Sequence, residues 1–190
     1  EKGGPDPSDY DEFTHLIRDV AIQVRAGKIS KEELRTIQMA FGKAFSTDTI
    51  QGFAYTKPHG YAGDFEIIHR IYQEWLSPDP HLVKWDYYAQ PQAAMKAVRN
   101  RKRYFKDLLK HLETNNKGSG IRMLNVASGP CDDIYEYLKE NDSSKVFFEC
   151  VDQDAKAIDF AQTMCRKYLH QIHFHNKNVF KFRSDKQFDL

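Results

Sequence analysis

The sequence has few cysteines, almost no net charge and no long apolar run. Its three cysteines, Cys131, Cys150 and Cys165, are odd in number and fall in expected helices or strands, so they indicate no disulfide framework and favour a reducing cytoplasm. A formal net charge of +1 argues against a nucleic-acid partner held by electrostatics. No stretch reaches the roughly 18 apolar residues of a membrane helix and no signal peptide is evident, so we expect no integral membrane segment.

What is present divides the chain into two halves. Apolar residues make up 41% of the 190 residues, which is enough for one large core or two small ones. Residues 1–9 are rich in glycine and proline and are expected to be disordered or extended. Residues 10–115 show helical periodicity, residues 116–120 have the composition of a linker, and residues 121–190 alternate short apolar runs with helical stretches.

The first half predicts an all-α N-terminal domain. Apolar residues over 13–24 recur at helical spacing, and Ser30–Glu33 form a capping box for a second helix. Residues 46–63 are expected to form a loop. Asp64 is expected to cap a third helix, and Pro91 to begin a long fourth one.

The second half predicts a parallel sheet. Strands are expected at Met123–Ala127, Val146–Val151 and Ile172–Phe174, separated by helices at Asp132–Lys139 and Ala155–Leu169. This alternation is typical of α/β folds.

A fourth strand is indicated at Phe188–Leu190, and in a doubly wound sheet it would pair beside the first. A parallel sheet needs both faces covered, and about 70 residues do not complete one. We therefore expect a sheet truncated after about three strands, and a natural protein that continues further.

The turn after the first strand indicates a ligand class. Ile121–Asp133, IRMLNVASGPCDD, is an apolar strand, a turn with one glycine and a helix start, and the next strand ends in Asp152. This is the front half of a Rossmann-like unit, with an acid about 20 residues past the turn, where a ribose hydroxyl is held. A dinucleotide turn has three glycines, however, and Asp132 and Asp133 would repel a phosphate at the helix start. S-adenosylmethionine (SAM) fits better, because it has a ribose, a positive charge and no phosphate.

Several segments resemble a known enzyme class. LNVASGPCDD, ECVDQDAKAIDFA and NKNVF resemble motifs I, post-I and II of class I SAM-dependent methyltransferases. KPHGYAGDFEII and AVRNRKRYF resemble a narrower bacterial group, which has a helical N-terminal domain and is described as making methyl esters of 3-hydroxy fatty acids such as 3-hydroxypalmitic acid, a cell-density signal. The resemblance covers roughly residues 50–190. It implies a Rossmann-like methyltransferase sheet, SAM as cofactor and transfer of a methyl group to a carboxylate.

The turn and the strand ends supply the expected cofactor site. Backbone amides near Ser128 and Gly129 would approach the methionine part of SAM, which only small residues allow. Asp152 would accept hydrogen bonds from the ribose hydroxyls, or Asp154 would do so if the strand ends later, and Asn178 would meet the adenine amino edge. The full expected set is Asn125, Ala127, Ser128, Gly129, Pro130, Asp152, Gln153, Asn178 and Val179.

The segment KPHGYAGD, residues 57–64, has two glycines within four residues, which predicts turns that a side chain would forbid. Its polar residues suggest a lid over a site, with His59 and Tyr61 as the expected catalytic residues. The alternative is a domain-joining turn in which Asp64 caps a helix. Arg99 and Arg101 do not share a helix face, so one of them is expected to clamp a carboxylate. The expected substrate or lid residues are Lys57, Gly60, Gly63, Asp64, Arg99 and Arg101.

The methyl acceptor decides the chemistry. A carboxylate is ionised at neutral pH and needs no base, so Lys57 or Arg99 would only orient it. A hydroxyl or an amine would require His59 or Tyr61 to take a proton. The resemblance favours a fatty-acid carboxylate, and a small-molecule acceptor is the expected partner. The sequence leaves the oligomeric state open.

Two other functions stay open. The first is a SAM-binding or partner-docking module without turnover. Asn125 is consistent with it, because motif I usually has an acid at this position, and asparagine can hydrogen-bond the methionine ammonium group but carries no charge. A methyltransferase acting on protein is the second, and the low net charge disfavours nucleic acid as its substrate.

A metal site and a hydrolase site are not supported. His170, His173 and His175 invite a zinc hypothesis, but a strand begins here and no cysteine or acid lies at ligand spacing, so no metal is expected. Ser128 precedes Gly129 directly and lacks the G-x-S-x-G elbow of a hydrolase.

Overall fold

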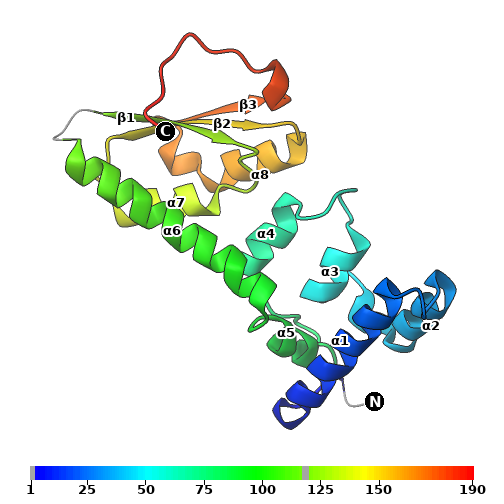
Figure 1. Cartoon of the computed structure of the whole chain (residues 1–190). Helices are drawn as coiled ribbons and strands as arrows, with labels where there is room; N and C mark the ends of the chain where they lie inside the picture. The colour runs from blue at the N-terminus through cyan, green and yellow to red at the C-terminus, as the bar shows by residue number, and fades with distance from the viewer. Residues whose placement is uncertain (1–2, 117–119) are drawn as a thin grey trace. The chain divides into compact units, whose positions relative to one another are not determined.

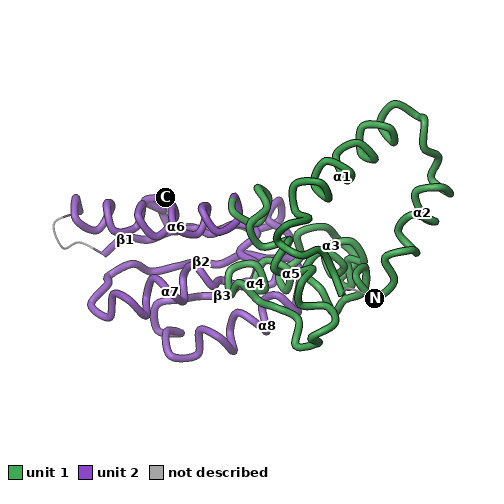
Figure 2. The backbone as a smooth tube through the Cα atoms, turned by 90° about the horizontal axis from the view of Figure 1, so that it is seen from below, with its two compact units in different colours: residues 1–96 green, residues 97–190 purple. Residues whose placement is uncertain are grey.

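The structure is a computed structural model that describes residues 3–116 and 120–190. It divides into two compact units, residues 1–96 and residues 97–190 (Figure 2). The division falls inside helix α6 (Ala93–Asn115) and not at 116–120, where the sequence analysis placed it. Residues 117–119 of that expected linker lie outside the described residues. The reason for the correction is Leu109, an α6 residue that is fully buried in the core of the second unit.

The regular elements in the described part of unit 1 are all helices or 3₁₀ turns. Its elements are the 3₁₀ turns η1 (Pro7–Asp9) and η2 (Gly42–Phe45) and the helices α1 (Tyr10–Arg25), α2 (Lys31–Ala40), α3 (Ile50–Thr56), α4 (Phe65–Tyr72), α5 (Val83–Ala89) and the start of α6. The predicted capping box is confirmed, because the Glu33 N–H donates to the Ser30 hydroxyl and the Ser30 N–H donates to the Glu33 carboxylate. Asp64 caps α4 as predicted, accepting the N–H groups of Glu66 and Ile67 at 3.0 Å each.

Two local expectations for unit 1 are wrong. The loop expected over 46–63 contains α3, which begins after Thr49, whose hydroxyl accepts the Gly52 N–H at 3.0 Å. Glycine usually weakens a helix interior, but a Cβ at Gly52 would lie 2.0 Å from the Ser46 carbonyl oxygen, so close packing requires it. Residues 7–9, expected to be disordered or extended, form η1 because Pro7 presets the backbone of a first helical turn.

A buried carboxylate joins the helices of unit 1. Asp86 on α5 is fully buried and accepts the N–H groups of Ile50, at the start of α3, and of Ser77, at 2.8 and 2.6 Å. Burial raises the pKa of Asp86, and the two donors oppose that shift. Since a buried carboxylate without donors is costly, these bonds hold α5 and α3 in register.

Unit 2 contains a parallel sheet. Its elements are the rest of α6, the strands β1 (Ile121–Val126), β2 (Val146–Asp152) and β3 (Ile172–Asn176), the helices α7 (Asp132–Glu140) and α8 (Ala155–Met164), and the 3₁₀ turns η3 (Arg166–Tyr168) and η4 (Val179–Lys181). The strands lie in the order β1-β2-β3, and Asn125, Cys150 and Phe174 stand side by side across them. The predicted strands are confirmed, so the protein is mixed α/β and mostly helical, with a three-stranded parallel sheet.

The helices of unit 2 lie on one side of the sheet (Figure 1). Their core side chains meet every second residue of the strands, as the period of a β-strand requires. The most deeply buried members of this core are Leu109, Cys131, Ile134, Tyr137, Leu138, Val146, Phe148, Cys150, Ala161 and Cys165. α6 and α7 are also joined by the Lys102 ammonium group, which lies 2.5 Å from the Glu136 carboxylate. This packing fixes the start of α7, and therefore the turn before it.

The segment Phe188–Leu190 lies beside β1. The Asp189 N–H donates to the Arg122 carbonyl oxygen at 2.8 Å, and the Leu124 N–H donates to the Leu190 carbonyl oxygen at 2.9 Å. The predicted pairing beside the first strand is confirmed, although the segment is not a regular strand. Within the described residues, no helix combines the length and the apolar character needed to cross a membrane.

Candidate functional site

The turn between β1 and α7 has an unusual backbone. Ala127, Gly129 and Cys131 have φ angles of 53°, 56° and 58°, all in the left-handed region. For a residue with a side chain this conformation costs about 1 kcal/mol or more, so the surrounding structure must hold Ala127 and Cys131 in place. The Ser128 N–H contributes by donating to the Val151 carbonyl oxygen at 3.2 Å. The turn is strained, and it lies at the carboxyl end of the first strand, where α/β sheets bind ligands.

Asp152, at the end of β2, is bonded to this turn. Its Oδ2 accepts the Gly129 N–H and its Oδ1 accepts the Asp154 N–H, both at 2.9 Å. Asp154 has a different role, because its side chain accepts the Lys156 N–H and caps α8. The strand therefore ends at Asp152, and of the two acids it is Asp152 that reaches the glycine turn.

Asn178 lies after β3, at the same edge of the sheet. Its Nδ2 donates to the Gln153 Oε1 at 3.2 Å, and its Oδ1 accepts the Phe180 N–H at 2.9 Å. Residues after three successive strands thus meet at one edge, as the sequence predicted. Val179 is 37% exposed and Phe180 is 85% exposed, so an apolar surface adjoins these polar groups.

Asn125 and Pro130 are expected members of the set for which the described residues show no side-chain hydrogen bond. Asn125 is half-buried on β1, and Pro130 is buried. Ser128 is 8% exposed, and its hydroxyl is a buried group without a hydrogen-bond partner in the part of the chain that the structure describes. A buried polar group left unpaired costs about 1–3 kcal/mol, which marks the turn as a place where a partner would be stabilising.

Two acids follow the turn at the start of α7. Asp132 is fully buried, and Asp133 is half-buried and accepts the Ile134 N–H at 2.9 Å. Burial raises the pKa of Asp133 to about 6; the Asp132 charge adds to the shift, and the Arg101 charge opposes it. Arg101, on α6, therefore lies close enough to act on the start of α7. The structure brings one of the two expected arginines to this end of the sheet, as an electrostatic neighbour of Asp133.

The segment KPHGYAGD belongs to unit 1. Lys57, Gly60 and Gly63 have φ angles of 49°, 88° and 70°, so the predicted left-handed turns are confirmed. No atom lies within 4 Å of a Cβ built at either glycine, so these positions need glycine for its backbone freedom and not for space. Asp64 is 1% exposed and serves as the helix cap, which was the structural alternative for this residue.

His59 is held by a chain of polar contacts. Its Nε2 lies 3.1 Å from the Glu66 carboxylate, and the other Glu66 oxygen accepts from Arg70 at 2.7 Å. Burial opposes ionisation of Glu66, but His59 and Arg70 outweigh it and lower the Glu66 pKa. The imidazole packs 4.7 Å from the Phe65 ring, and its Nδ1 is buried without a partner among the described residues. Tyr61, by contrast, is 41% exposed.

Sequence reasoning missed a buried ionic cluster on the sheet. Glu149 is 4% exposed, and its carboxylate binds the His175 Nε2 at 2.6 Å and the Lys186 ammonium group. Burial disfavours its charge, but Lys186 and His175 lower the Glu149 pKa below its ordinary value. The sequence signal that could have revealed this cluster is Glu149 itself, an acid inside the apolar run VFFECV. No group of three or more His, Cys, Asp or Glu residues suited to a metal ion occurs within 3–116 and 120–190.

Comparisons with known proteins add little to this geometric description of the site. No protein-family model matches the chain, and no curated protein matches it. One solved structure that resembles it is a possible exported protein from Bordetella parapertussis, with 18% identity and a TM-score of 0.49. The match covers 66% of this chain and 41% of that protein, so the chain spans less than half of the length of its structural neighbour.

Proposed function

We propose that this chain forms the cofactor-binding part of a SAM-dependent methyltransferase with a Rossmann-like sheet. The observation that carries the proposal is the bond from the Gly129 N–H to the Asp152 carboxylate, which joins a turn with a single glycine to the acid after the next strand. Asn178 lies after the third strand at the same edge, bonded to Gln153. A ribose and an adenine bind at such an edge in dinucleotide folds.

The residues at this edge suit the cofactor. Each carboxylate oxygen of Asp152 accepts one backbone N–H, so each can still accept one hydrogen bond from a ribose hydroxyl. The unpaired Ser128 hydroxyl is a further group that a ligand near the turn would satisfy. When bound, SAM supplies an electrophilic methyl group on a sulfonium.

The two acids at the start of α7 support a cationic ligand. A helix N-terminus alone attracts phosphate, but Asp132 and Asp133 place negative charge there. A pKa of about 6 leaves Asp133 mostly ionised at neutral pH. These charges disfavour a dinucleotide and favour the sulfonium and ammonium groups of SAM.

We propose a carboxylate of a small molecule or a fatty acid as the methyl acceptor. Methyl transfer is then an in-line displacement that needs positioning and exclusion of water, and no base. Arg101, near the start of α7, is a cation that could orient an anion there, since guanidinium binds carboxylates bidentately. The fatty-acid choice comes from the resemblance of KPHGYAGDFEII and AVRNRKRYF to the bacterial methyl ester group.

A test needs both binding and turnover on the longest natural form of the protein that contains this sequence. We expect calorimetry to give micromolar affinity for SAM or its demethylated product, and none for NAD. Labelled SAM and a 3-hydroxy fatty acid should yield an organic-soluble, base-labile methyl ester. Tight NAD binding with no heat from SAM would refute the cofactor assignment.

A SAM-binding module without turnover is the second candidate, and Asn125 favours it. Asn125 is half-buried on β1, and an acid at this position would add a negative charge for the ammonium group of SAM. Binding without methyl transfer to any fatty acid, small carboxylate or protein would support this candidate. An Asn125→Asp variant that binds SAM more tightly but still shows no turnover would strengthen it.

A further inference from the structure

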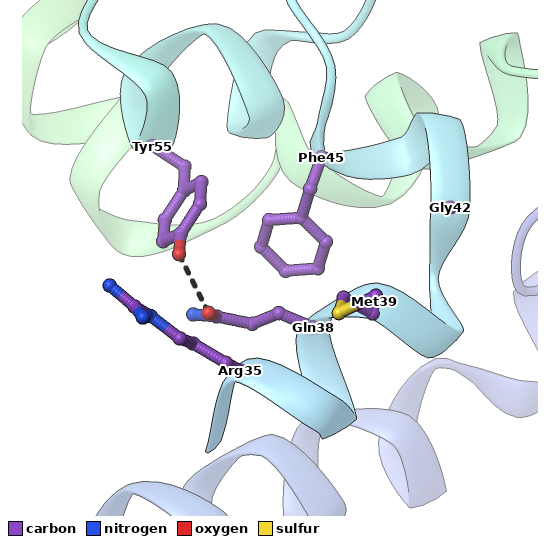
Figure 3. A pocket seen from close by; sticks show the side chains of 6 residues that line it. All are labelled: Arg35, Gln38, Met39, Gly42, Phe45 and Tyr55. Carbon is purple, nitrogen blue, oxygen red and sulfur yellow. Dashed lines mark hydrogen bonds between the residues drawn. The ribbon is translucent and has the colours of Figure 1, made fainter. Parts of the chain in front are cut away.

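Unit 1 contains a pocket that plays no part in the proposed methyl transfer. It has a volume of about 290 Å³ and is lined by Arg35, Gln38, Met39, Gly42, Phe45 and Tyr55 (Figure 3). The first three are spaced along one face of α2, and the others come from η2 and α3. This volume lies just below the range of about 300–1,000 Å³ that is usual for small-molecule sites.

The lining divides into an apolar part and a polar part. The Phe45 ring is fixed by edge-to-face contacts with Phe41 and Tyr55, at centroid distances of 5.6 and 5.2 Å. Met39 is 79% exposed, which leaves its flexible thioether free to close on a ligand. Gly42 has no side chain and no atom within 4 Å of a built Cβ, so the rim is open there.

The polar groups gather on one side. Figure 3 shows the Tyr55 hydroxyl and the Gln38 amide between the Phe45 ring on one side and the Arg35 guanidinium on the other. The Tyr55 hydroxyl donates to the Gln38 Oε1 at 2.6 Å, which turns the amide nitrogen of Gln38 outward as a donor. Arg35 is exposed and has no ion-pair partner in the described part of the chain. One cation and one amide donor therefore face the same space.

We propose that this pocket binds a small monocarboxylate with an aromatic or alkyl body. The carboxylate would accept hydrogen bonds from Arg35 and Gln38, and the body would cover Phe45 and Met39. A single exposed cation suits a monoanion better than a doubly charged phosphate, and the apolar floor requires a ligand that is not wholly polar. Because the pair with Arg35 is exposed to solvent, the carboxylate contributes mainly selectivity, and the apolar contact contributes most of the affinity.

The test uses 4-phenylbutyrate and, as its uncharged match, 4-phenylbutanol, followed by NMR of the ¹⁵N-labelled chain. We expect shifts in the amides of Gln38, Gly42, Phe45 and Tyr55 with the carboxylate, and binding about fivefold weaker with the alcohol. Arg35→Gln should weaken binding of the carboxylate by the same factor and leave the alcohol unchanged.

Arg25→Gln is the matched control, since Arg25 is an exposed arginine on α1 that does not line the pocket. This variant should bind both probes as the parent chain does. Arg35 is exposed, so its variant is expected to keep the amide spectrum of the folded protein. Equal affinity for the two probes, an unchanged Arg35→Gln variant, or shifts confined to other residues would each overturn the proposal.

Discussion

The Gly129 N–H donates to the Asp152 carboxylate at 2.9 Å, so the turn after the first strand and the end of the second are one structure. The bond leaves the Asp152 carboxylate half-buried and able to accept further hydrogen bonds. It also fixes Gly129 in a left-handed conformation, with a φ of 56°. A ligand at this edge would therefore meet a site whose backbone is already arranged.

Asp152 and Asp154 should differ in their effect on SAM binding. Asp152→Ala should weaken SAM binding by about 1–3 kcal/mol, because the ribose hydroxyls lose a charged partner. Asp154→Ala removes the α8 cap and should lower the free energy of unfolding by about 1 kcal/mol with little change in affinity. Calorimetry and chemical denaturation of both variants measure the two effects. The opposite order of affinities would contradict the role given to Asp152.

Asp133 should make the stability depend on pH in an unusual direction. Its pKa of about 6 in the folded protein lies above the ordinary value of 3.8. Between these values the folded state holds a proton that the unfolded state has lost, so the free energy of unfolding falls as pH rises. Asp133→Asn should remove this pH dependence and raise the free energy of unfolding by about 1–2 kcal/mol relative to the parent chain by pH 7, allowing for solvent screening.

Denaturation of both chains at a series of pH values from about 4 to about 7 measures the Asp133 effect as a difference. Asp142→Asn is the control, because the Asp142 side chain is 76% exposed. Its curve should run parallel to that of the parent. Parallel curves for Asp133→Asn as well would show that the folded state does not shift this carboxyl group.

The three cysteines should be unreactive in the folded protein. The Cys131 thiol lies 3.9 Å from the Cys150 sulfur, and this contact together with burial raises the pKa of Cys131. Burial also raises the pKa of Cys165. The thiolate is the reactive form of a cysteine, so Cys131 and Cys165 should resist an aromatic disulfide reagent at pH 8, and Cys150 should resist it because it is buried; all three should react fully in denaturant. Rapid stoichiometric labelling of the native chain would mean that this core opens readily.

Sequence signals predicted the parts of the fold that depend on local residues. The strands followed from short apolar runs, and the caps of α2 and α4 followed from Ser30 and Asp64. The sequence also predicted that residues after three strands would meet at one edge, because parallel strands share their carboxyl ends. The Asp152 bond to Gly129 spans two such ends.

The parts that were missed depend on contacts between distant residues. A glycine such as Gly52 is unfavourable in a helix interior, and its close approach to Ser46, which no local pattern shows, explains why α3 has it. Glu149 meets His175 and Lys186 from three separate segments, so no local pattern could join them. Leu109 packs in the core of unit 2, and the division between the units therefore falls inside α6. This packing also depends on residues far apart in the sequence.

His59 and Tyr61 should respond differently to substitution, although the sequence assigned both to catalysis. The His59 side chain is 15% exposed and bonded to Glu66, so His59→Ala removes a packed ring and leaves Glu66 without one partner. We expect a loss of about 1–3 kcal/mol in the free energy of unfolding. Tyr61 is 41% exposed, so Tyr61→Phe should change that free energy by about 0.5 kcal/mol or less.

Thermal melts and methyl-transfer rates per folded molecule separate structure from catalysis for these variants. If the KPHGYAGD segment acts in turnover, Tyr61→Phe should slow methyl transfer at least about tenfold, the lower range for loss of a positioned acid or base, while melting stays unchanged. His59→Gln is the matched control for packing, because it keeps a polar side chain near Glu66 and loses the ring. If Tyr61→Phe keeps the full rate and both His59 variants lose only stability, the segment is a structural turn. His59 would then serve to hold Glu66 in the first turn of α4, where Glu66 also binds Arg70 of the last turn, and the acceptor site would have to lie elsewhere.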